Sequence, residues 1–133
     1  MKKLLTLLSV SFLLFSCTQK NVKHAEPFKY KVSTDFVQGS EDIPLLVGMN
    51  KMLDESLGFD SDSGSIMASS YETKIDLEKV QAFYKKTLPQ MGWKLTKSDM
   101  AKLSFKREKE KLEIEFVNQN GKDIVRFFIS SAL

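Results

Sequence analysis

The sequence has very few of the residues on which catalytic nucleophiles, metal sites and disulfides most often depend. Its 133 residues include one cysteine, Cys17, and one histidine, His24. A single cysteine cannot form an internal disulfide, and no spacing of a zinc-ligand set is present. Residues 41–133 contain neither residue type, so a Ser-His or Cys-His catalytic arrangement cannot be built there. We expect a fold stabilised by packing alone, with no metal ion and no cofactor.

Charges of the two signs are nearly balanced, which argues against a nucleic-acid partner. Lys and Arg total 20 against 17 Asp and Glu, and the formal net charge is +3. Lys and Glu alternate through residues 102–115, whereas proteins that follow nucleic-acid backbones carry basic stripes. We therefore expect no nucleic-acid binding, and we interpret His24 as a solvent-facing side chain.

Long hydrophobic runs are also absent. The most apolar stretch, residues 4–15, follows the basic start Met1-Lys2-Lys3 and ends where the polar residues 18–21 begin. A membrane-spanning helix needs about 20 apolar residues, so this stretch is too short to span. Its proportions are those of a secretory signal peptide, and the sequence predicts an exported protein.

The residues before the cysteine point to a lipid anchor. Leu14, Phe15, Ser16 and Cys17 resemble the lipobox of bacterial lipoproteins, although Phe15 is bulkier than the usual residue at its position. The resemblance implies that the Cys17 thiol takes a diacylglycerol and that the signal peptide is then removed. It also implies anchoring by acyl chains in the cell envelope, and the absence of Asp at position 18 favours the outer membrane, facing the periplasm. An uncleaved anchor and a secreted protein with a free cysteine are the alternatives.

The chain is expected to have three parts. Residues 1–16 form the lipoprotein signal peptide, residues 17–40 the lipidated amino terminus and a tether, and residues 41–133 a single α+β domain. The tether is polar and contains Pro27, and its apolar residues from Phe28 to Phe36 predict at most one loosely placed strand.

The spacing of apolar residues predicts one helix. Between Asp76 and Met91, apolar side chains recur every three or four residues, as on one face of a helix. Asp76 can cap the start of this helix, while Pro89 and Gly92 end it.

Two hairpins after the helix are predicted from pairs of apolar side chains. A turn centred on Lys109-Glu110 places Phe105 opposite Ile114. A type I′ turn at Asn120-Gly121 places Ile114 opposite Phe127 and Glu115 opposite Arg126. Both hairpins then share one apolar face, made of Leu103, Phe105, Leu112, Ile114, Phe116, Val125, Phe127 and Ile129.

A further hairpin is expected before the helix. Residues 57–59 and 65–71 flank Asp60-Ser61-Asp62-Ser63-Gly64, which we interpret as a tight turn because its residues do not match the register of a calcium-binding EF-hand loop. Trp93 and Leu95 can extend the sheet beside Phe105. The expected architecture is an antiparallel sheet of about five strands with one helix on its apolar face, in the order ββαβββ.

A second resemblance covers residues 41–129. The segments Asp42-Ile43-Pro44-Leu45, Phe83-Tyr84, Leu88-Pro89-Gln90-Met91-Gly92-Trp93 and Phe105-Lys106-Arg107, with the Gly64-Ser65-Ile66 turn segment, resemble a family of small proteobacterial exported proteins that has no assigned catalytic activity. Ser65 replaces the arginine of the family pattern, so no role is transferred to that position. The resemblance supports the fold and implies no reaction.

These observations favour a non-catalytic binding or interaction module. We expect a membrane-anchored envelope lipoprotein that contacts another envelope protein through an edge or the polar face of its sheet. The alternative is a small-molecule or lipid carrier with an apolar cleft between helix and sheet, around Met91, Trp93, Phe105 and Phe127. A hydrolase using paired carboxylates is a third hypothesis, for which the candidates are Asp54, Glu55, Asp60, Asp62 and Glu72; we expect no enzyme.

Overall fold

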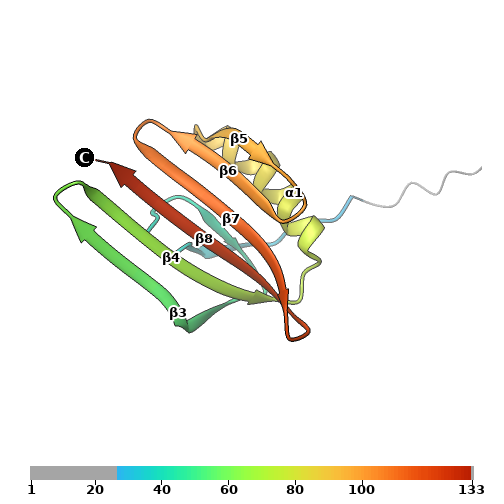
Figure 1. The fold of residues 1–133 in the computed structure, drawn as a ribbon. Coiled ribbons are helices and arrows are strands. Elements are labelled where there is room, and N and C mark those ends of the chain that lie inside the picture. Colours follow the sequence, from blue (N-terminus) through green and yellow to red (C-terminus); the bar gives the residue numbers. More distant parts are fainter. Residues whose placement is uncertain (1–26, 133) are drawn as a thin grey trace, which may run out of the picture.

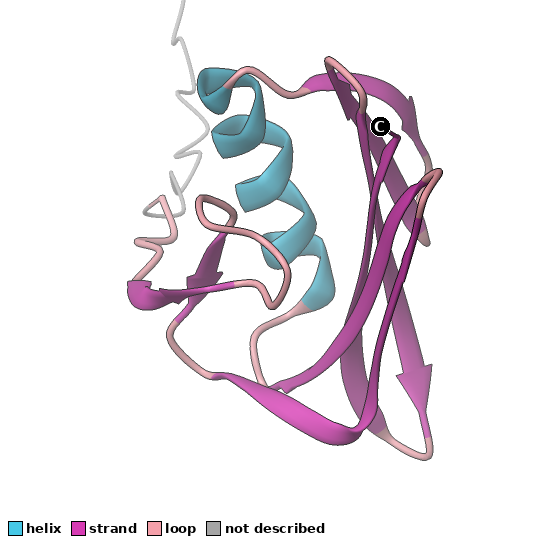
Figure 2. Cartoon of the chain, turned by 90° about the vertical axis from the view of Figure 1, so that its left-hand side faces the viewer, coloured by secondary structure: helices cyan, strands magenta, loops and turns pink. Residues whose placement is uncertain are grey.

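The computed structural model describes residues 27–132 and arranges them in two layers, with a sheet on one side and a helix with a short strand pair on the other (Figure 1, Figure 2). In chain order the elements are β1 (Val32–Phe36), β2 (Pro44–Leu46), β3 (Met49–Ser61), β4 (Gly64–Thr73), α1 (Leu77–Thr87), the 3-10 turn η1 (Leu88–Met91), β5 (Lys94–Ser98), β6 (Lys102–Arg107), β7 (Glu110–Gln119) and β8 (Lys122–Ala132).

The α+β class and the antiparallel sheet with one helix are confirmed, but the strand count of about five is too low. The main sheet has six strands in the order β3-β4-β8-β7-β6-β5, and β1 and β2 form a separate antiparallel pair. The additional strand is β5, in which Leu95 pairs with Phe105, so the expected extension of the sheet at Trp93 and Leu95 is a strand of its own. The order within the main sheet is therefore ββαββββ instead of ββαβββ.

The predicted helix is confirmed, and its last turn tightens. The Asp76 carboxylate accepts from the backbone N–H groups of Glu78 and Lys79, at 2.9 and 3.4 Å. Pro89 cannot donate to the helical hydrogen-bond ladder, and the chain continues from Leu88 as a 3-10 turn. Gly92 then adopts φ 87° and its N–H bonds back to this turn, which directs the chain into β5.

One hairpin register is as predicted and the other is shifted by two residues. At the Asn120-Gly121 turn, Ile114 pairs with Phe127 and Glu115 with Arg126. In the β6–β7 hairpin the turn lies at Glu108-Lys109, so Phe105 pairs with Leu112 and Arg107 with Glu110. Glu108 adopts a positive φ of 49°, and an ion pair joins the two residues that close the turn. A shift of two residues preserves the predicted apolar face.

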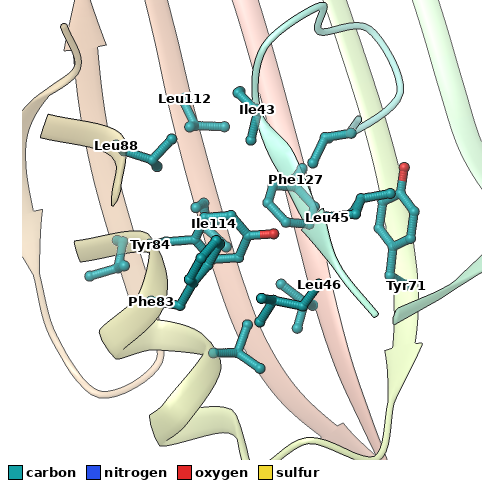
Figure 3. Close-up of a cluster of buried hydrophobic side chains, with 14 of the residues drawn as sticks. Ile43, Leu45, Leu46, Tyr71, Phe83, Tyr84, Leu88, Leu112, Ile114 and Phe127 are labelled. Carbon is teal, nitrogen blue, oxygen red and sulfur yellow. The ribbon is translucent and has the colours of Figure 1, made fainter. Parts of the chain in front are cut away.

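The core lies between this apolar face and a cover made of α1 and the β1–β2 pair (Figure 2, Figure 3). Leu46 and Ile43 are buried beside β2, and the Tyr84 hydroxyl donates to the Pro44 carbonyl oxygen at 2.9 Å. Val37 is fully buried. The folded region therefore begins before residue 41, where we placed the domain boundary, because Val37, which follows β1, belongs to the core.

No helix in the described part, residues 27–132, is long and apolar enough to cross a membrane.

Candidate functional site

The residues predicted to carry the lipid anchor lie outside the described part of the chain. Cys17, the lipobox residues Leu14, Phe15 and Ser16, and His24 all precede residue 27. Lipidation of Cys17 therefore stays a prediction.

The four residues proposed to surround an apolar cleft lie at the interface of helix and sheet, where side chains fill most of the space. Trp93, Phe105 and Phe127 are at most 2% exposed, and Met91 packs against the same core from its edge. One opening lies beside Trp93, at the end of the helix–sheet interface. This opening is partly polar, and three separate segments of the chain meet at it.

Arg107 is the centre of this meeting point. Its guanidinium carbon lies 4.2 Å from the centre of the Trp93 ring, so the cation stacks on the indole face. Its Nε donates to Glu110 Oε2 at 3.0 Å and its Nη1 to the Met91 carbonyl oxygen at 3.3 Å. Nη1 also forms an ion pair with Asp42. One side chain thus joins the loop before β2, the end of η1 and the β6–β7 turn.

The loop that carries Asp42 is held by its own hydrogen bonds. Ser40 Oγ donates to Asp42 Oδ1 at 2.9 Å and accepts from the backbone N–H groups of Asp42 and Ile43. The hydrogen bond from Arg107 holds the pKa of Asp42 below its ordinary value, and Asp42 in turn raises the pKa of Arg107. At neutral pH both groups are charged, and the loop is tied to the sheet.

A cleft of about 420 Å³ opens beside this cluster, and we call it the Arg107 cleft. Its charged lining comprises Glu41, Asp42, Glu110 and Arg107, a formal charge of 1 − 3 = −2. Arg107 is already engaged by two of the carboxylates, whereas the exposed Glu41 has no ion pair among the described residues. The remaining lining residues are Gly39, Ser40, Trp93 and Ile129.

Trp93 contributes an unusual polar atom to this region. The side chain is 2% exposed, yet its indole Nε1 has no hydrogen-bond partner within residues 27–132. A buried donor without a partner is rare in native proteins, because its desolvation is not compensated.

The chain matches a family model for START domain-like proteins over residues 54–122. The chain belongs to the START domain-like family. The matched segment runs from the second half of β3 to the β7–β8 turn and includes Trp93 and Arg107, while Asp42 lies outside it. No curated protein matches the chain at the significance required, and no solved structure does so.

This START domain-like chain has a second opening, with a volume of about 520 Å³, between the β1–β2 pair and the strands β3 and β4. Its lining combines the apolar side chains of Phe36, Leu45, Met49 and Tyr71 with the polar residues Asp35, Gln38, Asn50 and Lys51. Phe36 is 50% exposed there, and Gln38, also in the lining, has a buried Oε1 without a partner in the described region. We call this opening the Phe36 cleft.

The acidic residues considered for calcium binding lie at the β3–β4 turn. Within residues 27–132 no three His, Cys, Asp or Glu side chains are placed to hold a metal ion together. The segment after Asp60 is a tight turn in which Ser61 Oγ donates to the Gly64 carbonyl oxygen at 3.1 Å, as the turn interpretation predicted.

The motifs that form this site can be identified in the sequence, but the sequence does not show that they lie together in the fold. Asp42, Trp93 and Arg107 come from three segments that the family resemblance picked out separately, and each segment also had an explanation in packing or helix termination. Their polar atoms converge only after the β6–β7 hairpin and the loop before β2 are in place.

Proposed function

We propose that the protein is a membrane-anchored envelope lipoprotein whose START domain-like fold serves as a non-catalytic ligand-binding module. Acyl chains on Cys17 would hold it in the membrane, most simply the outer membrane on its periplasmic side. Membership of the START domain-like family supports a ligand-binding module. The lipobox resemblance of residues 14–17 supports the anchor.

The Arg107 cleft is the proposed binding site, and its ligand is a positively charged group. The excess of carboxylates in the lining supports a cationic ligand. Arg107 is neutralised by Asp42 and Glu110, whereas Glu41 is left unpaired among the described residues. An anion entering the cleft would meet this uncompensated negative charge. An amine would be attracted to it, whether on a small molecule or on a lysine of an envelope protein.

Fluorescence of Trp93 tests the proposal directly, because it is the only tryptophan of the chain. Full-length protein in detergent is titrated with the diamine cadaverine and, separately, with the dianion glutarate at equal ionic strength. We expect a saturable change in Trp93 emission with cadaverine only. The Glu41→Gln variant should bind several-fold more weakly, since it removes one of three carboxylates without breaking an ion pair.

Glu78→Gln is the matched control, because Glu78 is equally an exposed glutamate but lies in the first turn of α1, away from the cleft. Equal responses to cadaverine and glutarate, or an unchanged affinity in Glu41→Gln, would reject a cationic ligand at this site.

The Phe36 cleft supports a second candidate, the carrier of a small apolar molecule. The half-exposed Phe36 beside the unpartnered Oε1 of Gln38 would suit an apolar ligand with one hydrogen-bond donor. Native mass spectrometry of protein extracted from its own envelope would detect such a ligand. The carrier would be supported if the ligand were lost in Phe36→Ser and retained in Glu41→Gln.

A further inference from the structure

The face of the sheet opposite α1, which faces the viewer in Figure 1, combines basic and apolar side chains at one end. The register places Lys106, Lys111, Ser130, Ile66 and Phe59 side by side across five strands. The β3–β4 turn, the end of β8 and the β6–β7 turn meet at this end (Figure 1). We call this region the basic-apolar end.

The lysines of this region are not neutralised by the protein itself. Lys106 and Lys111 are directly opposite one another, and Lys109 lies in the adjoining turn. All three are exposed, and none has an ion pair within residues 27–132. The nearby Glu113 is bound to Lys102 at 2.7 Å. Like charges directly opposite in a sheet are unfavourable, so an external anion would stabilise this pair.

The apolar side chains beside them are unusually exposed. Leu57 is 71% exposed, Phe59 64% and Ile66 53%, and all three share this face of the sheet with the partly buried Phe128. Phe59 and Ile66 also border a hollow of about 290 Å³ together with Lys109 and Lys111. Apolar groups and cations therefore meet in one shallow depression.

We propose that the basic-apolar end docks the domain on an anionic lipid bilayer. The three lysines would approach the lipid phosphates, and Phe59, Leu57 and Ile66 would enter the headgroup region. A bilayer fits better than an acidic protein because the exposed aliphatic and aromatic side chains need an apolar environment as well as an anionic one. Glu108 and Asp62 in the adjoining turns offset part of the positive charge and leave the excess on the lysines.

This contact would add to the proposed anchor at Cys17 without depending on the Arg107 cleft. The acyl chains would hold the protein at the membrane, and a basic patch would add a second contact that orients the domain. Each lysine near an anionic surface contributes about 1 kcal/mol, equivalent to about a fivefold change in binding. Docking would orient the sheet on the membrane and leave α1 and the β1–β2 pair facing away from it (Figure 2).

A probe at residue 66 tests the proposal in the full, lipidated protein. Ile66→Cys carries an environment-sensitive fluorophore, and the protein is reconstituted into vesicles of phosphatidylcholine alone or of phosphatidylcholine and phosphatidylglycerol in a three-to-one ratio. We expect emission to shift to the blue on the anionic vesicles only. Met100→Cys is the control, because Met100 is 90% exposed but lies in the β5–β6 turn.

Variants without lysine charges test whether these lysines contact the anionic bilayer. In Lys109→Gln/Lys111→Gln the docked-to-undocked ratio should fall about fivefold for each lysine removed. The matched pair Lys85→Gln/Lys86→Gln, in the last turn of α1, should leave docking unchanged. The proposal is overturned if positions 66 and 100 respond alike, if phosphatidylglycerol has no effect, or if docking requires an added acidic protein. Loss of the anchor is recognised separately, because the protein then fails to sediment with vesicles of phosphatidylcholine alone.

Discussion

At the scale of single residues, Arg107 has the most varied set of contacts of this site. It bonds to Asp42, Glu110 and the Met91 carbonyl oxygen and covers one face of Trp93. Its side chain is 24% exposed, so its ion pairs are partly shielded from solvent. The same contacts can stabilise the fold and shape the cleft. Substituting one residue that Arg107 contacts removes a single interaction, whereas substituting Arg107 removes all of them at once.

Replacing Asp42 with Asn should weaken the attachment of the loop before β2. We expect a loss of about 1 kcal/mol in the free energy of unfolding at neutral pH, small because the Asp42 side chain is 37% exposed. Urea unfolding measures this loss, and Asp62→Asn, in the exposed β3–β4 turn, is the control. A similar cost in both variants would contradict a specific contribution of the ion pair.

The pH dependence of the same variant follows from the lowered pKa of Asp42. The unfolded value is about 3.9 and the folded value lies below it, so the contribution of Asp42 is complete above about pH 4 and is lost as the pH falls through the folded pKa. The difference between wild type and Asp42→Asn should therefore shrink in acid. A difference that stays constant down to about pH 2 would contradict this assignment.

At the scale of elements, the contact between α1 and β2 holds the cover together. Tyr84 is fully buried, its ring packs edge-on against Phe127, and its hydroxyl reaches the Pro44 carbonyl oxygen (Figure 3). Burial raises the pKa of Tyr84, so the hydroxyl stays protonated and remains a donor. The helix and the β1–β2 pair therefore act as one layer over the sheet.

Tyr84→Phe should cost about 1–2 kcal/mol, because the phenylalanine keeps the packing and leaves the buried carbonyl without this donor. Urea unfolding of Tyr84→Phe measures the cost, and Tyr30→Phe makes the same chemical change at a partly buried tyrosine of the core edge. If the two variants lost equal stability, the hydrogen bond to Pro44 would not be a specific link between the layers.

At the scale of the whole molecule, the two proposed surfaces lie on opposite faces of the sheet. The Arg107 cleft is lined by the core residue Trp93, on the side of α1, whereas the register places Lys111 and Ile66 on the other face of the sheet. An anchored domain could thus rest on the membrane and still present its cleft. This arrangement depends on the amino-terminal anchor, which is testable by itself.

Intact mass spectrometry of membrane-extracted protein tests the anchor. We expect a mature chain that starts at Cys17 and is heavier than its sequence mass by the acyl groups, because the lipobox resemblance implies acylation of that thiol before cleavage. The Cys17→Ala variant should lose the added mass. An unmodified wild-type chain would remove the basis for membrane anchoring and would leave the cleft proposal untouched.

Local sequence patterns were sufficient to predict much of the fold. The helix, its Asp76 cap, the Asn120-Gly121 turn and the apolar face of the last three strands were all predicted, because each depends on residues close in sequence. The β6–β7 register was wrong by two residues, since Lys109-Glu110 and Glu108-Lys109 are similar turn candidates and either preserves the apolar face. The contribution of Val37, which follows β1, was not predicted, because this side chain is buried only where the rest of the chain surrounds it.

Residues close together in the chain are sufficient to predict the α+β class, the helix, the apolar face and a lipid anchor, because these rest on periodicity, caps and contiguous motifs. The tertiary structure alone decided where polar groups meet. Asp42, Trp93 and Arg107 are far apart in the chain and converge through a loop, a helix end and a hairpin. It likewise placed Lys111 opposite Lys106, since cross-strand neighbours depend on a register that the apolar pattern leaves undetermined to within two residues.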